Sequence, residues 1–226
     1  MLRRNLSIFI AAAIGLVILC GLGTWQVKRL AWKEGLIAAL EARMAQAPVP
    51  LAEALKRVQA GEDVEYLKVA AKGQLDTAHV ILKQTTFKST AGWEGLAPFR
   101  ADDGSEVLVD LGAASSHDTE AKPVTEISGV LRLHNLGQGI FDPPNNIRDN
   151  EWFWWDVPAM QKEAGMKPGD ALVILQAADN ASGFTAAAPK VELRNNHLGY
   201  AITWFGLAAA LVGVTAAFVL RKADLK

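Results

Sequence analysis

The chain has 226 residues, half of them hydrophobic, and its formal net charge at pH 7 is −1. This near balance argues against a nucleic-acid-binding protein, which would carry a basic excess or a basic stripe. The single cysteine, Cys20, excludes a disulfide within one chain and any paired-cysteine copper or zinc site. We therefore expect no nucleic-acid partner and no thiol-based metal delivery.

An apolar segment near the amino terminus, residues 6–25, contains no charged side chain. As a helix it would be about 30 Å long, which is enough to cross the hydrocarbon core of a bilayer. A cleaved signal peptide is the alternative, because Arg3 and Arg4 precede the apolar stretch, but no A-x-A-like cleavage site follows it. The sequence therefore predicts an uncleaved transmembrane helix over 6–25, after a short tail at residues 1–5.

The helical pattern continues after this segment. Residues 31–46 keep a helical period, and Pro48 and Pro50 end it. We expect the first helix to continue out of the membrane. A second, short helix is expected over residues 51–59.

From Tyr66 onward, short runs rich in β-branched and aromatic residues are separated by Gly, Asp and Ser. Their spacing favours an antiparallel sheet or a small barrel over βαβ units. A short helix is expected over 156–164, and residues 181–189 are expected to form a mobile loop. The expected strands cover residues 66–75, 79–87, 93–100, 106–111, 126–134, 171–177 and a piece around Val191.

A second uncharged apolar segment, residues 197–220, lies near the carboxyl terminus and would form a helix of about 36 Å. Basic residues are equally divided between the two sides, so the positive-inside rule does not choose an orientation. The predicted fold class is an α+β membrane protein with two transmembrane helices. They flank a water-exposed domain at 26–196, an antiparallel β-sheet or small barrel with short helices, and residues 221–226 form a second tail on the same side of the membrane as residues 1–5.

Enzymatic motifs are missing from the sequence. It contains no Gly-x-Ser-x-Gly, no phosphate-binding glycine-rich loop and no His-Glu-x-x-His, and its carboxylates are scattered. His79, His117 and His134 stand alone in predicted strands or a loop, and we interpret them as ordinary strand or loop residues. We expect a protein that is not an enzyme.

Two stretches stand out from this background, and the first is a proline- and asparagine-rich turn at 141–146 followed by the aromatic run 152–155. Such a turn is rigid, and the aromatic side chains after it are large and apolar. The rings either cover the end of the sheet or form a surface that docks a partner. The pattern leaves both interpretations open.

The second stretch begins the apolar segment at residue 197. On a helix, His197, Tyr200, Ala201 and Trp204 share one face. An imidazole at the water boundary, above an aromatic and small-residue face, can ligate a haem iron. Alternatively, the two preceding asparagines cap the helix, and the histidine and tyrosine are interfacial polar residues. Spacing alone favours the second interpretation, because a single histidine is a weak signal for a ligand.

Three motifs in this chain resemble the surfeit locus protein 1 family, and the resemblance covers almost the whole sequence with the same two-span layout. One departure is Leu111-Gly112-Ala113, where the family usually has an Arg-Gly-Trp-like sequence. The residues that carry the resemblance are Gly23–Lys33, Phe141–Asn146 with Trp152–Asp156, and Asn195–Phe205, with looser matches at Gly92–Pro98 and Val107–Asp110.

The resemblance implies an assembly factor for cytochrome c oxidase or a related haem–copper oxidase. Such a factor would bind haem a transiently and aid its insertion into the catalytic subunit. The family pattern carries a histidine at the position of His197, which we expect to be the iron ligand. Tyr200 and Trp204 would line the contact face, with Trp25 and Gln26 of the first helix on the other side.

The resemblance also implies two spans with an extracytoplasmic domain at 26–196 and cytoplasmic tails at 1–5 and 221–226. We expect a bacterial inner membrane, with the domain on the periplasmic side, over a mitochondrial one, because Arg3 and Arg4 lead directly into the first span with no organellar presequence before it. The partners implied are the catalytic oxidase subunit, haem a synthase as a further candidate, and the lipid bilayer. Ala11 and Gly15 are expected to let the first helix pack closely. The alternative is a structural scaffold that holds oxidase subunits through the Trp152–Trp155 loop and binds no haem.

Overall fold

The computed structural model describes residues 2–134, 137–167, 173–179, 182–191 and 193–223. The chain divides into two units, which we describe separately. The helical unit comprises residues 1–39 and 192–226, and the sheet unit comprises residues 40–191.

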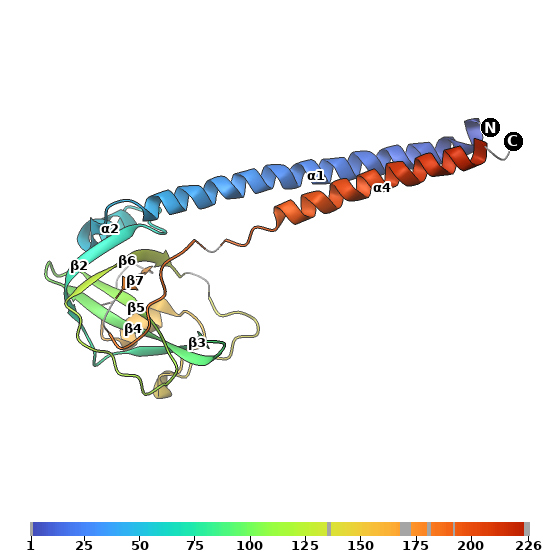
Figure 1. Ribbon diagram of the computed structural model, residues 1–226. Helices are drawn as coiled ribbons and strands as arrows, with labels where there is room; N and C mark the ends of the chain where they lie inside the picture. Colours follow the sequence, from blue (N-terminus) through green and yellow to red (C-terminus); the bar gives the residue numbers. More distant parts are fainter. Residues whose placement is uncertain (1, 135–136, 168–172, 180–181, 192, 224–226) are drawn as a thin grey trace. The chain divides into compact units, whose positions relative to one another are not determined.

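The helical unit contains most of α1 (Leu2–Met44) and all of α4 (His197–Ala223). The two helices run side by side, and the first turn of α1 lies at the same end as the last turn of α4 (Figure 1). Helix α1 continues without a break past residue 25, as the period of residues 31–46 predicts. By length and composition, Leu6–Met44 and His197–Arg221 could each cross a membrane. Only 6% of the most apolar window of each helix is buried, whereas the core helix of a soluble protein is mostly covered.

Small residues mark the contact between the two helices. A Cβ atom at Gly23 would lie 2.8 Å from the ring of Phe205, and one at Gly15 would lie 3.2 Å from Leu211. Both glycines therefore let the helices approach closely. The expectation for Ala11 is wrong: its side chain is exposed, because the half-buried stripe of α1 runs through residues 12, 15 and 19.

The sheet unit contains seven strands in its described residues, in the order β1-β2-β6-β7-β5-β4-β3. An additional pairing of β2 with β4 closes five of them into a ring, which agrees with the small barrel predicted from the sequence. The elements are β1 (Val49–Pro50), α2 (Leu51–Gln59), β2 (Lys68–Leu75), β3 (Ile81–Phe87), β4 (Thr90–Ala101), β5 (Glu106–Ala114), β6 (Glu126–Leu133), the 3-10 helix η1 (Ile147–Asp149), α3 (Val157–Glu163) and β7 (Val173–Asp179).

The sheet is mixed, and the expectation of a wholly antiparallel sheet is wrong. Strands β1 and β2 are parallel, and so are β5 and β7. Strand β7 returns after a long connection and inserts between β5 and β6, which run in opposite directions, so it must be parallel to one of them. Val191 lies outside any strand, and residues 171–172 and 192 lie outside the described residues.

Two apolar clusters fill the sheet unit. The larger contains Phe99, Leu111 and Ile127, and the smaller lies under α3 around Trp152 and Met160. The predicted mobile loop at 181–189 is partly wrong, because the ring of Phe184 packs into the larger cluster and is only 5% exposed. Thr185 also pairs with Ala113 through two backbone hydrogen bonds of 2.9 Å, which anchor this segment to β5. Residue 181 lies outside the described residues.

Candidate functional site

His197 is the first residue of α4, where the apolar helix begins. The first-turn bond runs from the Tyr200 backbone N–H to the Asn196 carbonyl at 3.3 Å. The interpretation in which both asparagines cap the helix receives no support at Asn195, because its Oδ1 atom is buried and accepts no hydrogen bond from any described residue. The start of α4 therefore leaves the imidazole free to contact α1.

The imidazole of His197 makes a short hydrogen bond to α1. Its Nδ1 atom lies 2.7 Å from Oε1 of Gln26, a residue that is only 8% exposed. An amide oxygen can only accept, so Nδ1 carries the proton of the neutral imidazole and Nε2 carries the lone pair. No described residue bonds to Nε2. Gln26 therefore holds the ring in the tautomer in which Nε2 can bind a metal.

Aromatic and small side chains surround this pair within the helical unit. The Trp25 ring meets the His197 ring edge-on at a centroid distance of 6.5 Å and is 55% exposed. Ala201 is buried and Trp204 is half-buried. Tyr200 is exposed and lines a separate hollow with neighbouring α4 residues. The structure thus brings Trp25 and Gln26 to His197, while Tyr200 faces outward.

The remaining histidines contact other groups of the sheet unit. His79 Nδ1 lies 3.0 Å from Asp76, His117 meets a tryptophan ring edge-on, and His134 stacks on Trp155 at 4.1 Å. Within the described ranges, no three His, Cys, Asp or Glu side chains gather in a way that could hold a metal ion. His197 is therefore the histidine whose surroundings best suit a ligand.

The aromatic run after η1 is largely structural. Trp152 is fully buried, and its indole N–H donates to Oδ1 of Asn150 at 3.2 Å. Oδ1 of Asn145 accepts from the backbone N–H of Phe153 at 2.8 Å, which fixes the turn that the prolines and asparagines predict. Trp152 covers the sheet, as one of the two interpretations holds. The most exposed apolar residue of this motif is Phe141, at 96%.

Sequence reasoning missed a row of charged residues on neighbouring strands of the sheet. Lys83 of β3 pairs with Glu94 of β4 at 3.1 Å, and Asp110 of β5 lies next to them, 8% exposed. Burial raises the pKa of Asp110 to about 8, and the nearby negative charge of Glu94 acts in the same direction. The sequence signal that could have indicated this row is the presence of a charged residue within each of three successive predicted strands, namely Lys83, Glu94 and Asp110.

The charged row continues into the aromatic loop. The ammonium of Lys83 lies 4.6 Å from the centroid of the Trp155 ring, on which His134 stacks. Burial lowers the pKa of His134 to about 4, and the positive charges of Arg132 and Lys83 contribute to the shift. At neutral pH the row therefore contains a protonated carboxyl group and a neutral imidazole.

Comparison with known proteins gives a consistent picture. The model of the SURF1 family matches residues 13–209. A Surfeit locus protein 1 of Xenopus tropicalis is 30% identical over 90% of this chain and 73% of its own length. The Gallus gallus protein of that name is 32% identical over 84% of this chain and 68% of its own length. A bacterial SURF1-like protein, from Rickettsia conorii, is 28% identical over 93% of this chain and 89% of its own length. The chain therefore belongs to the SURF1 family, which has bacterial members.

Proposed function

We propose that this chain is an assembly factor for cytochrome c oxidase that binds haem a transiently and aids its insertion into the catalytic subunit. In this proposal α1 and α4 cross a bacterial inner membrane, both termini are cytoplasmic, and the sheet unit is periplasmic. The chain has no catalytic role of its own. The catalytic oxidase subunit is the partner, and haem a synthase is a candidate donor of the haem.

The observation that carries the proposal is the 2.7 Å bond between Nδ1 of His197 and Oε1 of Gln26. Histidines that ligate a metal usually donate their other ring N–H to an oxygen, which fixes the tautomer and raises the basicity of the ligating nitrogen. Haem iron accepts such a neutral imidazole as an axial ligand. The exposed face of Trp25 beside the ring offers an apolar surface to a porphyrin.

A single protein ligand suits a carrier that must release its cargo. A second strong axial ligand would hold the iron on both faces and oppose its transfer to the catalytic subunit. The His197 site has one imidazole, and α4 exposes large apolar side chains along its length. Lipid-facing helices would let an apolar macrocycle enter and leave sideways.

The test is to purify the chain from cells that synthesise haem a and to record its absorbance spectrum. We expect a Soret band at a fixed stoichiometry that His197→Ala abolishes. Added imidazole should restore part of this band, because the free ligand can occupy the vacated space and donate to Gln26. His79→Ala is the matched control, since His79 is also half-exposed and bonded to an oxygen, and it should leave the spectrum unchanged.

An unchanged haem content in the His197→Ala protein would refute the ligand assignment. The scaffold alternative predicts a different result, in which oxidase subunits copurify with a colourless protein. Its contact surface cannot include Trp152, which is fully buried, but the neighbouring Ile140 and Phe141 are each 96% exposed. Replacing both with Ser would abolish subunit copurification if the scaffold alternative is correct.

A further inference from the structure

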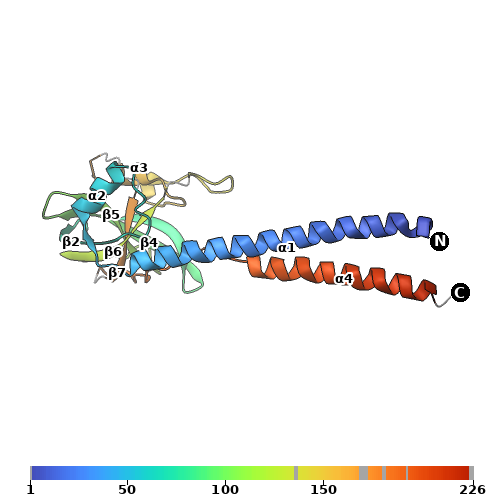
Figure 2. The ribbon, with the colours of Figure 1, turned by 90° about the horizontal axis from the view of Figure 1, so that it is seen from above.

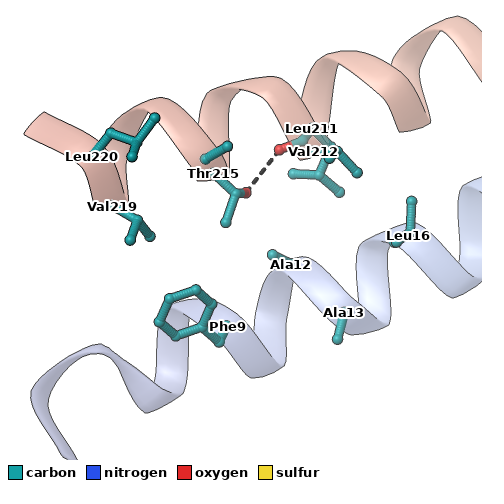
Figure 3. Close-up of a pocket in the computed structure, with 10 residues that line it drawn as sticks. Phe9, Ala12, Ala13, Leu16, Leu211, Val212, Thr215, Val219 and Leu220 are labelled. Carbon is teal, nitrogen blue, oxygen red and sulfur yellow. Dashed lines mark hydrogen bonds between the residues drawn. The ribbon is translucent and has the colours of Figure 1, made fainter. Parts of the chain in front are cut away.

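An apolar groove of about 480 Å³ lies between α1 and α4, near the two chain ends (Figure 3). Nearly all of its lining side chains are apolar. Its single hydroxyl, on Thr215, donates to the Leu211 carbonyl at 2.7 Å and is thereby satisfied within α4. The groove therefore offers no polar group to a ligand and suits a hydrocarbon chain. Its volume lies within the range of about 300–1,000 Å³ that is typical of small-molecule sites.

The groove exists because the close contact between the helices stops at Gly15 and Leu211. Beyond that point the side chains at Ala12, Ala13 and Ala216 are too short to fill the space between the helices. Figure 2 shows the two helices moving apart toward the chain ends. The larger residue Phe9 stands at the far end of the groove in Figure 3. Phe9 therefore limits the groove at that end.

The groove lies between the same two helices that carry His197 and Gln26. Leu211 lies fourteen positions after His197, which is about 21 Å along α4. Leu16 lies ten positions before Gln26, which is about 15 Å along α1. Both distances end at the near end of the groove, which the outer part of an isoprenoid chain attached to the rim of a porphyrin is long enough to reach. A ligand held by its iron at His197 could therefore place a long apolar substituent in the groove.

We propose that this groove receives the isoprenoid side chain of a prenylated haem whose iron is held by His197. The inference rests on the proposed function, and it adds to the His197 site a second contact, for the hydrocarbon tail of the ligand. In a bilayer the tail leaves lipid and not water, so the gain comes from packing against the groove and from tethering, and not from the hydrophobic effect.

Two haems provide a matched pair of probes. Haem o differs from protohaem by a hydroxyethylfarnesyl group in place of one vinyl group, so the tail is the only variable. Full-length protein in detergent micelles would be titrated with each haem and followed by its Soret absorbance. We expect haem o to bind at least about tenfold more tightly than protohaem.

Filling the groove should remove this preference. Ala12→Phe places a ring in the groove and should lower the affinity for haem o to that for protohaem, while protohaem affinity stays unchanged and shows that the helices still fold. Ala11→Phe is the matched control, because Ala11 is the adjacent residue, carries the same side chain and is exposed on α1. It should change neither affinity.

Equal affinities of the wild-type chain for the two haems would overturn the inference and leave the groove to a lipid acyl chain. The same conclusion follows if Ala12→Phe lowers the affinity for haem o and the affinity for protohaem by the same factor, since the substitution would then only disturb the packing of the two helices. Failure of the proposed function would give a different result from failure of the tail contact. In that case neither haem would bind the wild-type chain, or both haems would still bind the His197→Ala variant. If only the contact between tail and groove is wrong, the Soret band that depends on His197 remains.

Discussion

The buried carboxyl group of Asp110 makes the stability of the sheet unit depend on pH in an unusual direction. Asp110 Oδ1 accepts from the Gly112 backbone N–H at 2.8 Å, and Glu94 lies beside it. The substitution Asp110→Asn keeps the shape and the acceptor, and it replaces the acidic proton with an N–H donor. The variant therefore removes the titration and preserves the contacts.

The magnitude follows from the displaced pKa. The unfolded chain ionises Asp110 near pH 3.8, and the folded chain only near pH 8. The stabilising contribution of the neutral acid is therefore complete below about pH 4, declines as the pH rises, and is lost above about pH 8. At about 1.4 kcal/mol per pH unit, the upper limit of the loss is about 6 kcal/mol. This is comparable with the whole stability of a small domain.

The assay is urea unfolding of the full chain in mild detergent, followed by tryptophan fluorescence between pH 5 and pH 8. We expect Asp110→Asn to become progressively more stable than wild type as the pH rises. Asp103→Asn is the control: hydrogen bonds from Ser105 lower the pKa of Asp103, so its carboxylate is ionised in both the folded and the unfolded chain across this range, and the variant should keep the wild-type pH dependence. Parallel stability curves for wild type and Asp110→Asn would refute a neutral Asp110 in the folded chain.

Three further predictions concern single side chains. Gln26→Leu removes the acceptor for the imidazole and should weaken haem binding by about 10–100-fold in a Soret titration; an unchanged affinity would contradict the tautomer argument. Gly23→Val forces a methyl group into the Phe205 ring and should destabilise the helix pair by about 1–3 kcal/mol in thermal unfolding. A Cβ atom at Gly21 would meet no atom within 4 Å, so Gly21→Val is the matched control and should have no such effect. His134 should titrate near pH 4 in proton NMR, where a midpoint close to the ordinary 6.5 would show that its ring is not buried.

Elements defined by local patterns could be predicted from the sequence. The short helix α2 occupies the range 51–59 that the sequence predicts, and β6 differs from its expected range by one residue. Both depend on neighbours within a few positions, such as prolines, glycines and alternating apolar residues. The continuation of α1 to Met44 follows from the same kind of periodicity.

Elements that depend on distant partners could not be predicted in this way. The direction of β7 is set by the gap between β5 and β6, and no residue within β7 encodes it. Phe184 lies in a stretch of small residues whose composition indicates a loop, yet its ring fills space above Gly95. Tertiary packing decides both cases, and local propensity carries no information about it.

The candidate site lies between these two situations. His197 and Gln26 are 171 positions apart, and no local pattern joins them. In two antiparallel helices, however, the residue that follows the first apolar segment, Gln26, lies at the same level as the residue that begins the second, His197. A polar side chain at an apolar helix contact needs a hydrogen-bonding partner, and at this level each of the two residues is the available partner of the other. The depth of a residue along each of the two helices therefore predicts the pair, and the amide oxygen then selects the ring nitrogen that keeps its lone pair.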